Sequence, residues 1–497
     1  MRWLRLSSWI YLGLVIILPL TALLVKIRIS SFSFSLLISH SFTNSLIIAL
    51  ITTLMAVLLG GLAAVFLAKS PISGKRIWSI LLVMPLFFVP YQSALSWSAL
   101  MHSGRLSAFI FSRAGVIFIL TGCFYPITFW FTLVAISSIP RVEEESGLLI
   151  SSPGQVFSRI TLPKILPSLL TGGILVFLLA FTELGVPTYL GIPVLPYEVL
   201  IQFATKYDFQ AAVASTLPMT FVVILLLLWE YRSLRQGFIF YQQRTEAPGL
   251  VFDLKGYPLI LIKGFLLCIL FLFLIIPLGT LIIQSAHLNA ISFAMKNSFK
   301  SLGRSIFYGL IAGFIAALWS ITALFFRKGE ENPAFSFLTL TGFFLPPPLI
   351  AIALIAFWGE LPGLSLVYSS FLILILGLLA RFSVFSYRAM STAFENLDQS
   401  SWEAAYLMTD SWWIILKKIV YPQVRPWFFL GMCIVFIFSM NELGLSTILY
   451  PPGQEPLIVR LYTLSVNNPL PFSSSLALLN SLGTLLIIVI FYRWGMR

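Results

Sequence analysis

Two polar segments interrupt an otherwise apolar chain, and their acidic residues recur with the same spacing. They read VEEESGLLISSPGQVFSRITLPK and SWEAAYLMTDSWWIILKKIVYPQ. The separation of Glu144 from Pro163 equals that of Glu403 from Pro422 (163 − 144 = 19 and 422 − 403 = 19). Each segment predicts a short helix, a turn and a second helical stretch that ends near the proline. The shared spacing indicates two copies of one device.

A second pair of carboxylates shows the same repeat. The offset between the two segments is 403 − 144 = 259, and the same offset relates Thr-Glu-Leu-Gly at 182–185 to Asn-Glu-Leu-Gly at 441–444. Both glutamates fall inside apolar runs, where a carboxylate is costly and should face a cavity or a partner. We therefore expect a gate or translocation pathway at the interface of two repeats, formed by Glu183, Gly185, Glu442 and Gly444. Polar contacts between helices, without any contact to a substrate, are the alternative.

The composition predicts a membrane protein. Of the 497 residues 59% are hydrophobic and only 10% are charged, against about 25% charged in an average soluble domain. The net charge of +13 would suggest nucleic acid in a soluble protein, but Lys and Arg also accumulate in cytoplasmic loops of membrane proteins. We expect a lipid bilayer around the chain and no nucleic acid partner.

The three cysteines and three histidines offer no chemistry of their own. The cysteines lie in apolar runs without paired spacing, and the histidines have no spacing that fits a metal. We expect no catalytic residue, no bound metal and no cofactor.

The apolar runs predict an all-α polytopic membrane protein, because spans of about 20 residues must satisfy their backbone polar groups internally. The first run is read as a retained span and not as a cleaved signal peptide. Twelve spans are predicted, at about 8–27, 42–68, 77–100, 113–137, 167–190, 211–231, 258–284, 298–326, 334–358, 364–390, 427–450 and 472–495.

Basic residues orient these spans. With both termini in the cytoplasm, most of the 31 Lys and Arg residues, Arg381 and Arg388 among them, fall on the cytoplasmic side. Both polar segments then lie in the cytoplasm. The predicted organisation is a six-helix half at 1–235 with its loop at 141–164, a linker at 236–257, and a second half at 258–497 with its loop at 395–423.

The polar segments resemble the EAA loop of ATP-binding cassette (ABC) importer permeases. That loop reads Glu-Ala-Ala, three residues, Gly, nine residues, then Ile-x-Leu-Pro. The first segment departs from it at Glu145, Ser146 and Ile150, and the second at Thr409 and Tyr421. The residues assigned to this loop are Glu144, Gly147, Ile160, Leu162 and Pro163 in the first copy, and Glu403, Ala404, Ala405, Ile419 and Pro422 in the second.

The resemblance implies a function for these loops. In that family they form coupling helices that dock on two copies of a cytoplasmic ATPase, and the glutamate can pair with basic groups of that partner. The chain has no Gly-x-x-x-x-Gly-Lys-Ser/Thr motif, so ATP would be bound by the partner and the chain itself would not be an enzyme. Because the first copy is degenerate, we expect Glu403→Arg to abolish uptake and Glu144→Arg to do less.

The resemblance also suggests a location and a solute. A chain with two fused halves is similar to the ferric-iron and thiamine permeases of the bacterial inner membrane, which work with a periplasmic or surface solute-binding protein. Ferric iron is the first candidate, and thiamine or another small anion or cofactor is the alternative. A twelve-helix secondary transporter driven by an ion gradient is the main rival class, and a membrane enzyme ranks behind it.

Overall fold

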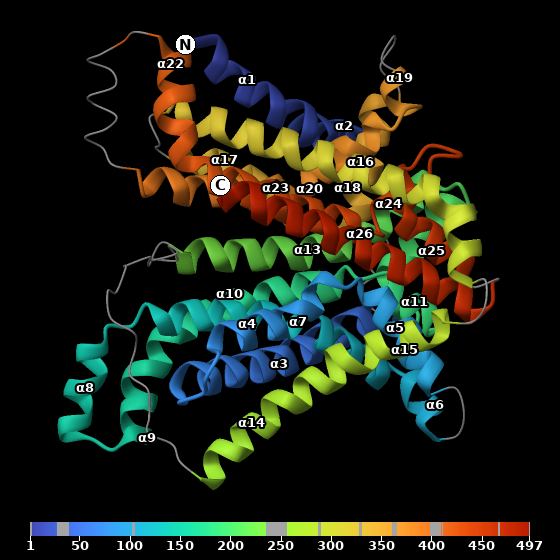
Figure 1. Ribbon diagram of the computed structural model, residues 1–497. Coiled ribbons are helices and arrows are strands. Elements are labelled where there is room, and N and C mark those ends of the chain that lie inside the picture. Colours follow the sequence, from blue (N-terminus) through green and yellow to red (C-terminus); the bar gives the residue numbers. More distant parts are fainter. Residues whose placement is uncertain are drawn as a thin grey trace.

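The fold consists of long membrane-spanning helices and short connecting helices (Figure 1). The computed structural model describes residues 2–26, 39–101, 105–234, 256–286, 290–327, 331–359, 365–397, 409, 411–465 and 468–496. Within these ranges the chain is helical and has no β-strand, which confirms the predicted all-α class.

The first half of the chain contains the following helices, in which η1, η5 and η6 are π-helical and η4 is a 3₁₀ turn. They are α1 (Arg2–Leu12), η1 (Gly13–Ile17), α2 (Leu18–Lys26), α3 (His40–Lys69), α4 (Lys75–Val83), η4 (Met84–Phe87), α5 (Pro90–Leu100), α6 (Arg105–Ile110), α7 (Arg113–Ser137), α8 (Arg141–Ile150), α9 (Pro153–Val156), η5 (Phe157–Thr161), α10 (Leu162–Phe181), α11 (Gly185–Tyr189), α12 (Leu195–Leu200), η6 (Ile201–Thr205) and α13 (Phe209–Leu234).

The second half repeats this order, with η7 and η8 as its π-helical segments. Its helices are α14 (Tyr257–Leu270), η7 (Phe271–Ile275), α15 (Ile276–Ser285), α16 (Ala290–Phe325), α17 (Pro333–Phe344), α18 (Pro347–Trp358), α19 (Ser365–Tyr368), α20 (Leu372–Glu395), α22 (Trp412–Ile415), η8 (Leu416–Val420), α23 (Tyr421–Met440), α24 (Ser446–Leu449), α25 (Leu457–Ser465) and α26 (Leu470–Met496).

Ten of the described helices are long and apolar enough to cross a membrane, and the number rises to twelve if each of two bent pairs is one span. The bent pairs are the third predicted span of the first half and its counterpart in the second. Lys75–Phe87 meets Pro90–Leu100 at 89°, and Pro333–Phe344 meets Pro347–Trp358 at 108°. A residue before proline avoids the helical conformation, and Val89 and Pro346 are accordingly extended, with ψ of 131° and 133°. Prolines thus break one span at the same place in each half.

Hydrogen bonds also reveal the repeat. The Ser45 hydroxyl accepts a bond from the N–H of Leu195 at 2.9 Å, and the Ser305 hydroxyl accepts one from Leu457 at 2.7 Å. In both halves the second long helix therefore binds the first residue of a short helix, α12 or α25. Both halves also carry a π-helical segment in their first span, at η1 and η7. These features align the halves at offsets close to that of the sequence repeat.

The first span of each half packs against the other half. Helix α2 lies along α18, and the Trp319 indole N–H donates to the Ser8 carbonyl at 3.3 Å. In turn α15 lies along α5, and the Phe273 ring occupies the space above Gly122 on α7. The two halves are therefore interlocked. The predicted boundaries at 235 and 258 stay predictions, since the linker falls mostly outside the described residues.

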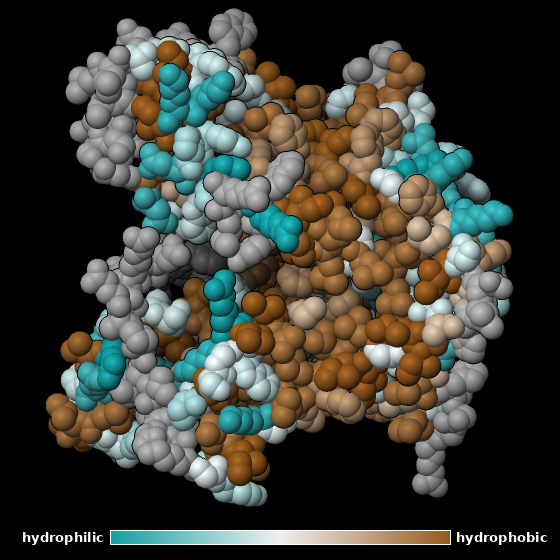
Figure 2. Space-filling view, viewed as in Figure 1, coloured by the Kyte–Doolittle hydropathy of each residue, from teal (hydrophilic) through white to brown (hydrophobic). Residues whose placement is uncertain are grey.

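The surface matches a bilayer. A hydrophobic belt crosses the molecule, and hydrophilic residues gather at its two ends (Figure 2). One end of the bundle holds helices α8 and α22 together with the N- and C-terminal ends of the chain, and it is here named the α8 end (Figure 1). Helices α6, α19 and α25 lie at the opposite end, named the α25 end.

Close contact between α3 and α7 depends on a glycine and gives a first prediction. A Cβ on Gly60 would lie 2.5 Å from the Tyr125 carbonyl oxygen and 2.7 Å from the Phe129 nitrogen. Because this backbone cannot yield cheaply, Gly60→Ala should cost about 1–3 kcal/mol of stability. Thermal unfolding in detergent should show a lower midpoint. Gly264→Ala is the matched control, because nothing lies within 4 Å of a Cβ there. Equal midpoints for the two variants would contradict the described packing.

Candidate functional site

The first polar segment forms a short helix, α8, followed by a break and a long helix. Helix α8 covers the predicted stretch, and Ser151 is extended. Ser152 and Gln155 then form a capping box that starts α9, and the helix continues through η5 and α10 to Phe181. The second helical stretch was predicted to end near Pro163. It does not, because Pro163 lies in the first turn of α10, where its missing N–H is tolerated.

Glu144 is buried and binds within the chain. Only 1% of its side chain is exposed, against 4% for Lys69, whose Nζ donates to Glu144 Oε1 at 2.7 Å and to Oε2 at 2.5 Å. The Thr161 hydroxyl donates to the same carboxylate at 2.7 Å. The expectation that this glutamate pairs with basic groups of a partner protein is therefore wrong for the first copy. Glu144 instead fixes α8 to the ends of α3 and η5.

Gly147 and Ile160 complete this attachment. A Cβ on Gly147 would lie 2.7 Å from Ile160 Cδ1, so the glycine lets α8 approach η5 closely. Leu162 is partly exposed next to Pro163. All five assigned residues of the first loop therefore lie on α8, on η5 or in the first turn of α10, where these helices meet.

The opposite face of α8 is apolar and open. Leu149 is 86% exposed and Ile150 is 87% exposed, and Val142 is also exposed. Two ion pairs flank them, between Lys164 and Glu143 and between Arg141 and Glu145. A helix that projects beyond the membrane with uncovered leucine and isoleucine side chains has the character of a protein docking surface.

The second polar segment is described only in part. Glu403, Ala404 and Ala405 lie outside the described residues. Ile419 lies in η8, and Pro422 lies in the first turn of α23, as Ile160 and Pro163 do in the first copy.

Sequence reasoning missed the role of Lys69. The sequence repeat could have indicated this role, because Lys328 corresponds to Lys69 at the same offset as the two loops (328 − 69 = 259). A basic residue thus accompanies the loop glutamate in both halves of the sequence, although Lys328 itself is outside the described ranges.

Glu183 and Glu442 lie in breaks and not within continuous helices. Helix α10 ends at Phe181 and α23 ends at Met440, so each glutamate sits between a long helix and a short one. Glu183 Oε1 accepts from the N–H groups of Gly185 at 3.0 Å and Val186 at 3.4 Å, and Glu442 Oε1 accepts from Leu445 at 2.9 Å. Each carboxylate thus caps the helix that follows it, α11 or α24.

The two breaks lie together at the interface between the halves. A Cβ on Gly185 would lie 3.0 Å from Leu443 Cδ2 and 3.1 Å from a Tyr91 ring carbon. Gly444 lies beside Pro347, at the break of the other bent span, where a Cβ would be 3.5 Å from the proline Cβ. All four residues predicted for the pathway therefore surround one junction, built from the breaks of four helices.

Tyr91 connects this junction to helix α25. Its ring lies 5.3 Å from Tyr189 and 5.6 Å from Tyr462, centroid to centroid, and its hydroxyl bonds to Ser465. Side chains of both halves thus surround a residue in the first turn of α5.

Arg381 joins the junction from α20. Its Nε lies 3.5 Å from Glu442 Oε2, and only 5% of the side chain is exposed. The prediction that placed Arg381 on the cytoplasmic side is wrong. The corresponding residue of the first half is Gly122 (381 − 259), so the basic group belongs to one half alone. Its position inside a predicted span was the available signal, since an intramembrane charge marks a functional site by default.

The described residues hold no group of three or more His, Cys, Asp or Glu side chains that could bind a metal ion. Polar side chains at the junction are instead two carboxylates and one guanidinium, held by helix ends. Such a set can bind or exclude a charged solute.

These features define a polytopic helical membrane protein of two interlocked repeats, with a charged junction between them and an attached helix that projects at one end. Residues 309–495 match the family described as binding-protein-dependent transport system inner membrane component. Most of the second half is thus similar to this family, and relatives named as transport permeases extend the similarity to the rest of the chain.

Several relatives carry such names. The molybdenum transport system permease protein ModB of Mycobacterium tuberculosis is 28% identical over 257 residues, which is 45% of this chain and 93% of that protein. A Haemophilus influenzae protein that carries the name ferric transport system permease protein FbpB 1 is 22% identical over 461 residues, or 84% of this chain and 71% of that protein. The trehalose transport system permease protein SugB of Mycobacterium tuberculosis is 32% identical over 161 residues, which is 30% of this chain and 53% of that protein.

Proposed function

We propose that the chain forms the translocation pathway for ferric iron in an importer powered by a separate ATPase. One observation carries the choice of iron: the similarity to the relative named for ferric transport extends over both halves, whereas the ModB match covers less than half of the chain. Two carboxylates against one guanidinium at the junction also suit a cationic solute better than an anion.

The proposed pathway passes the junction of Glu183 and Glu442. Movement of the halves against each other would separate Gly185 from Leu443, which pack closely across the interface. In the proposed cycle this junction opens alternately to the two sides of the membrane. The α8 end would face the cytoplasm together with both termini, and the α25 end would face a periplasmic or surface binding protein.

We further propose that α8 is a coupling helix for one of two copies of a cytoplasmic ATPase. The exposed Leu149 and Ile150 would enter the partner's groove, and the Lys69–Glu144 pair would transmit force from α8 to α3. The second polar segment would serve the other ATPase copy. A secondary transporter, the rival class, needs no coupling helix, and the match of residues 309–495 to the binding-protein-dependent family argues against it.

An oxyanion such as molybdate is the second candidate solute. ModB is named for molybdenum, and among the described residues the Nε and Nη1 atoms of Arg381 have no hydrogen-bond acceptor. A guanidinium with free donors is a good ligand for an oxyanion.

Uptake into proteoliposomes that hold the chain with its ATPase and binding protein separates the candidates. Radioactive ferric iron should accumulate in an ATP-dependent manner, and molybdate should not compete with it. Accumulation of molybdate without iron would replace the first candidate with the second. Uptake driven by an ion gradient in vesicles without ATPase would refute the proposed energy source.

Substitutions on α8 test the coupling surface directly. Leu149→Asp with Ile150→Asp should reduce co-purification of the ATPase at least 10-fold, because two buried anchors of an interface would be replaced by charges. Glu145→Gln is the control on the same helix, since its exposed pair with Arg141 contributes about 0–1 kcal/mol. Full retention of the ATPase by the double variant would show that α8 docks through another face.

A further inference from the structure

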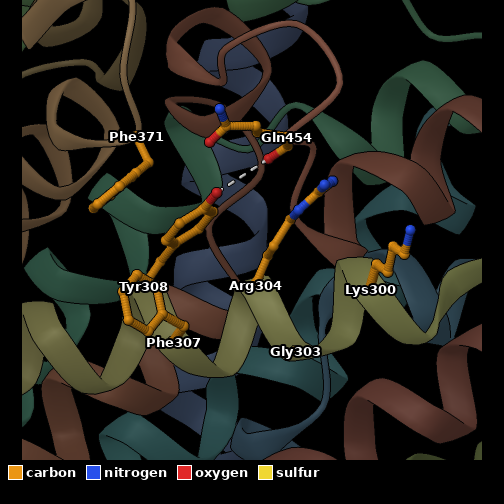
Figure 3. A pocket seen from close by; sticks show the side chains of 7 residues that line it. All are labelled: Lys300, Gly303, Arg304, Phe307, Tyr308, Phe371 and Gln454. Atoms are coloured by element: carbon orange, nitrogen blue, oxygen red, sulfur yellow. Dashed lines mark hydrogen bonds between the residues drawn. The ribbon is translucent and has the colours of Figure 1, made fainter.

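An open groove at the α25 end has no place in the proposed transport cycle (Figure 3). It has a volume of about 510 Å³, within the range of sites for small molecules. Helix α16 forms one wall, and the other wall comes from the residues before α20 and after α24. The lining residues are Lys300, Gly303, Arg304, Phe307, Tyr308, Phe371 and Gln454.

Two cations give the groove its charge. Lys300 and Arg304 are one helical turn apart on α16, and neither has an ion-pair partner among the described residues. The neighbouring carboxylate is already neutralised, because Arg460 binds Glu455 at 2.5 Å. The Tyr308 hydroxyl donates to the Gln454 carbonyl at 3.4 Å (Figure 3). An anionic group that enters here would meet two uncompensated positive charges.

The depth of the groove corresponds to the lipid headgroups. Arg304 and Phe325, the last residue of α16, differ by 21 in residue number (325 − 304 = 21). At 1.5 Å per residue this distance is about 32 Å, and a tilt of about 20° reduces it to about 30 Å, the thickness of the hydrocarbon core. Arg327 follows two residues after Phe325, at the other boundary. Arg304 is therefore at the level of one headgroup layer, and Lys300 is one turn farther out.

An apolar stripe continues from the groove into the hydrocarbon region. Phe307, Phe314 and Leu318 are exposed, and their spacing of i, i+7 and i+11 places them on one face of α16. The stripe extends about 16 Å along the helix, which suits an acyl chain. The two cations complement the phosphate of a phospholipid, and the apolar stripe complements its acyl chain.

We propose that this groove binds one anionic phospholipid, with its phosphate between Lys300 and Arg304 and an acyl chain along the stripe. The first half has other residues at the positions of Lys300 and Arg304. Alignment on Ser45 and Ser305 places His40 and Asn44 at the corresponding positions (an offset of 260), and these two side chains bond to each other at 3.2 Å. One lipid per chain is therefore expected.

Native mass spectrometry of the full chain in detergent tests the site, with phosphatidylglycerol and phosphatidylcholine as probes. We expect one phosphatidylglycerol to be retained, and Lys300→Ala with Arg304→Ala to weaken its binding at least 10-fold. Lys206→Ala removes an exposed lysine that precedes α13 in the first half and should leave it unchanged. If the double variant unfolds, the single charge reversal Lys300→Glu at an exposed position gives the same test.

Several outcomes would overturn the proposal. They are equal retention by the double variant, equal loss in Lys206→Ala, equal binding of phosphatidylcholine, or displacement of the lipid by millimolar inorganic phosphate. Unchanged lipid binding together with lost affinity for a solute-binding protein would show that the groove docks protein instead.

Discussion

Glu144→Ala should abolish ATP-driven uptake. The substitution leaves the Lys69 ammonium buried without its carboxylate, and breaking a buried pair in this way costs about 3–5 kcal/mol. It also frees α8 from α3, so that movement of an ATPase would no longer reach the membrane helices. Uptake into proteoliposomes and the thermal unfolding midpoint together measure the two effects.

A matched control separates burial from charge. Glu143→Gln removes the neighbouring glutamate, whose pair with Lys164 is about half exposed, and should change uptake little. Replacing both members, as in Lys69→Met with Glu144→Leu, removes the uncompensated charge and should recover most of the stability. If Glu144→Ala transports normally, the buried pair has no part in coupling.

The same contact bears on an expectation drawn from the sequence. The degenerate first loop suggested that Glu144→Arg would be milder than Glu403→Arg. Because Lys69 already occupies the site, a second cation there should be at least as damaging as the loss of the carboxylate.

Arg381→Met should have the second large effect. Without the guanidinium, Glu442 and Glu183 remain as two carboxylates at a buried junction with no cation to offset them. We expect uptake to fall at least 10-fold and the unfolding midpoint to drop, because the cost of unpaired buried charge is several kcal/mol.

Two further variants sharpen this test. Adding Glu442→Gln to Arg381→Met should restore stability in part, while uptake stays low if the charges act on the solute. Arg388→Met is the control on the same helix, since its pair with Glu331 at 2.8 Å is about one-third exposed. Equal losses in the two single arginine variants would point to a general role of α20 and not to the junction.

The sequence predicted the parts of this structure that depend on periodic pattern and spacing. Twelve apolar runs, the duplication and the helix at 141–150 all follow from composition and from a constant offset, and the repeat also brought Glu183 and Glu442 together. The direction in which a side chain points did not follow from spacing. Glu144 lies one residue from two exposed glutamates, and only the position of Lys69 decides that it faces inward.

The positions at which helices break were harder to predict than the presence of the helices themselves. Pro90 and Pro347 start new helices at bends of 89° and 108°, whereas Pro163 lies within a continuous helix, because its position in the first turn needs no N–H. Arg381 was misplaced because charge counting assigns every arginine to a loop, although a carboxylate from the facing helix can hold it inside.

The packing of the first span of each half against the other half has a consequence for synthesis of the chain. Helix α2 ends at Lys26, but α18, against which it packs, begins only at Pro347, well inside the second half. The span that ends with α2 must therefore wait in the lipid until α18 has been inserted. Assembly of the native protein cannot be completed half by half, and a ribosome that stops after the first repeat would leave α2 without the helix against which it packs.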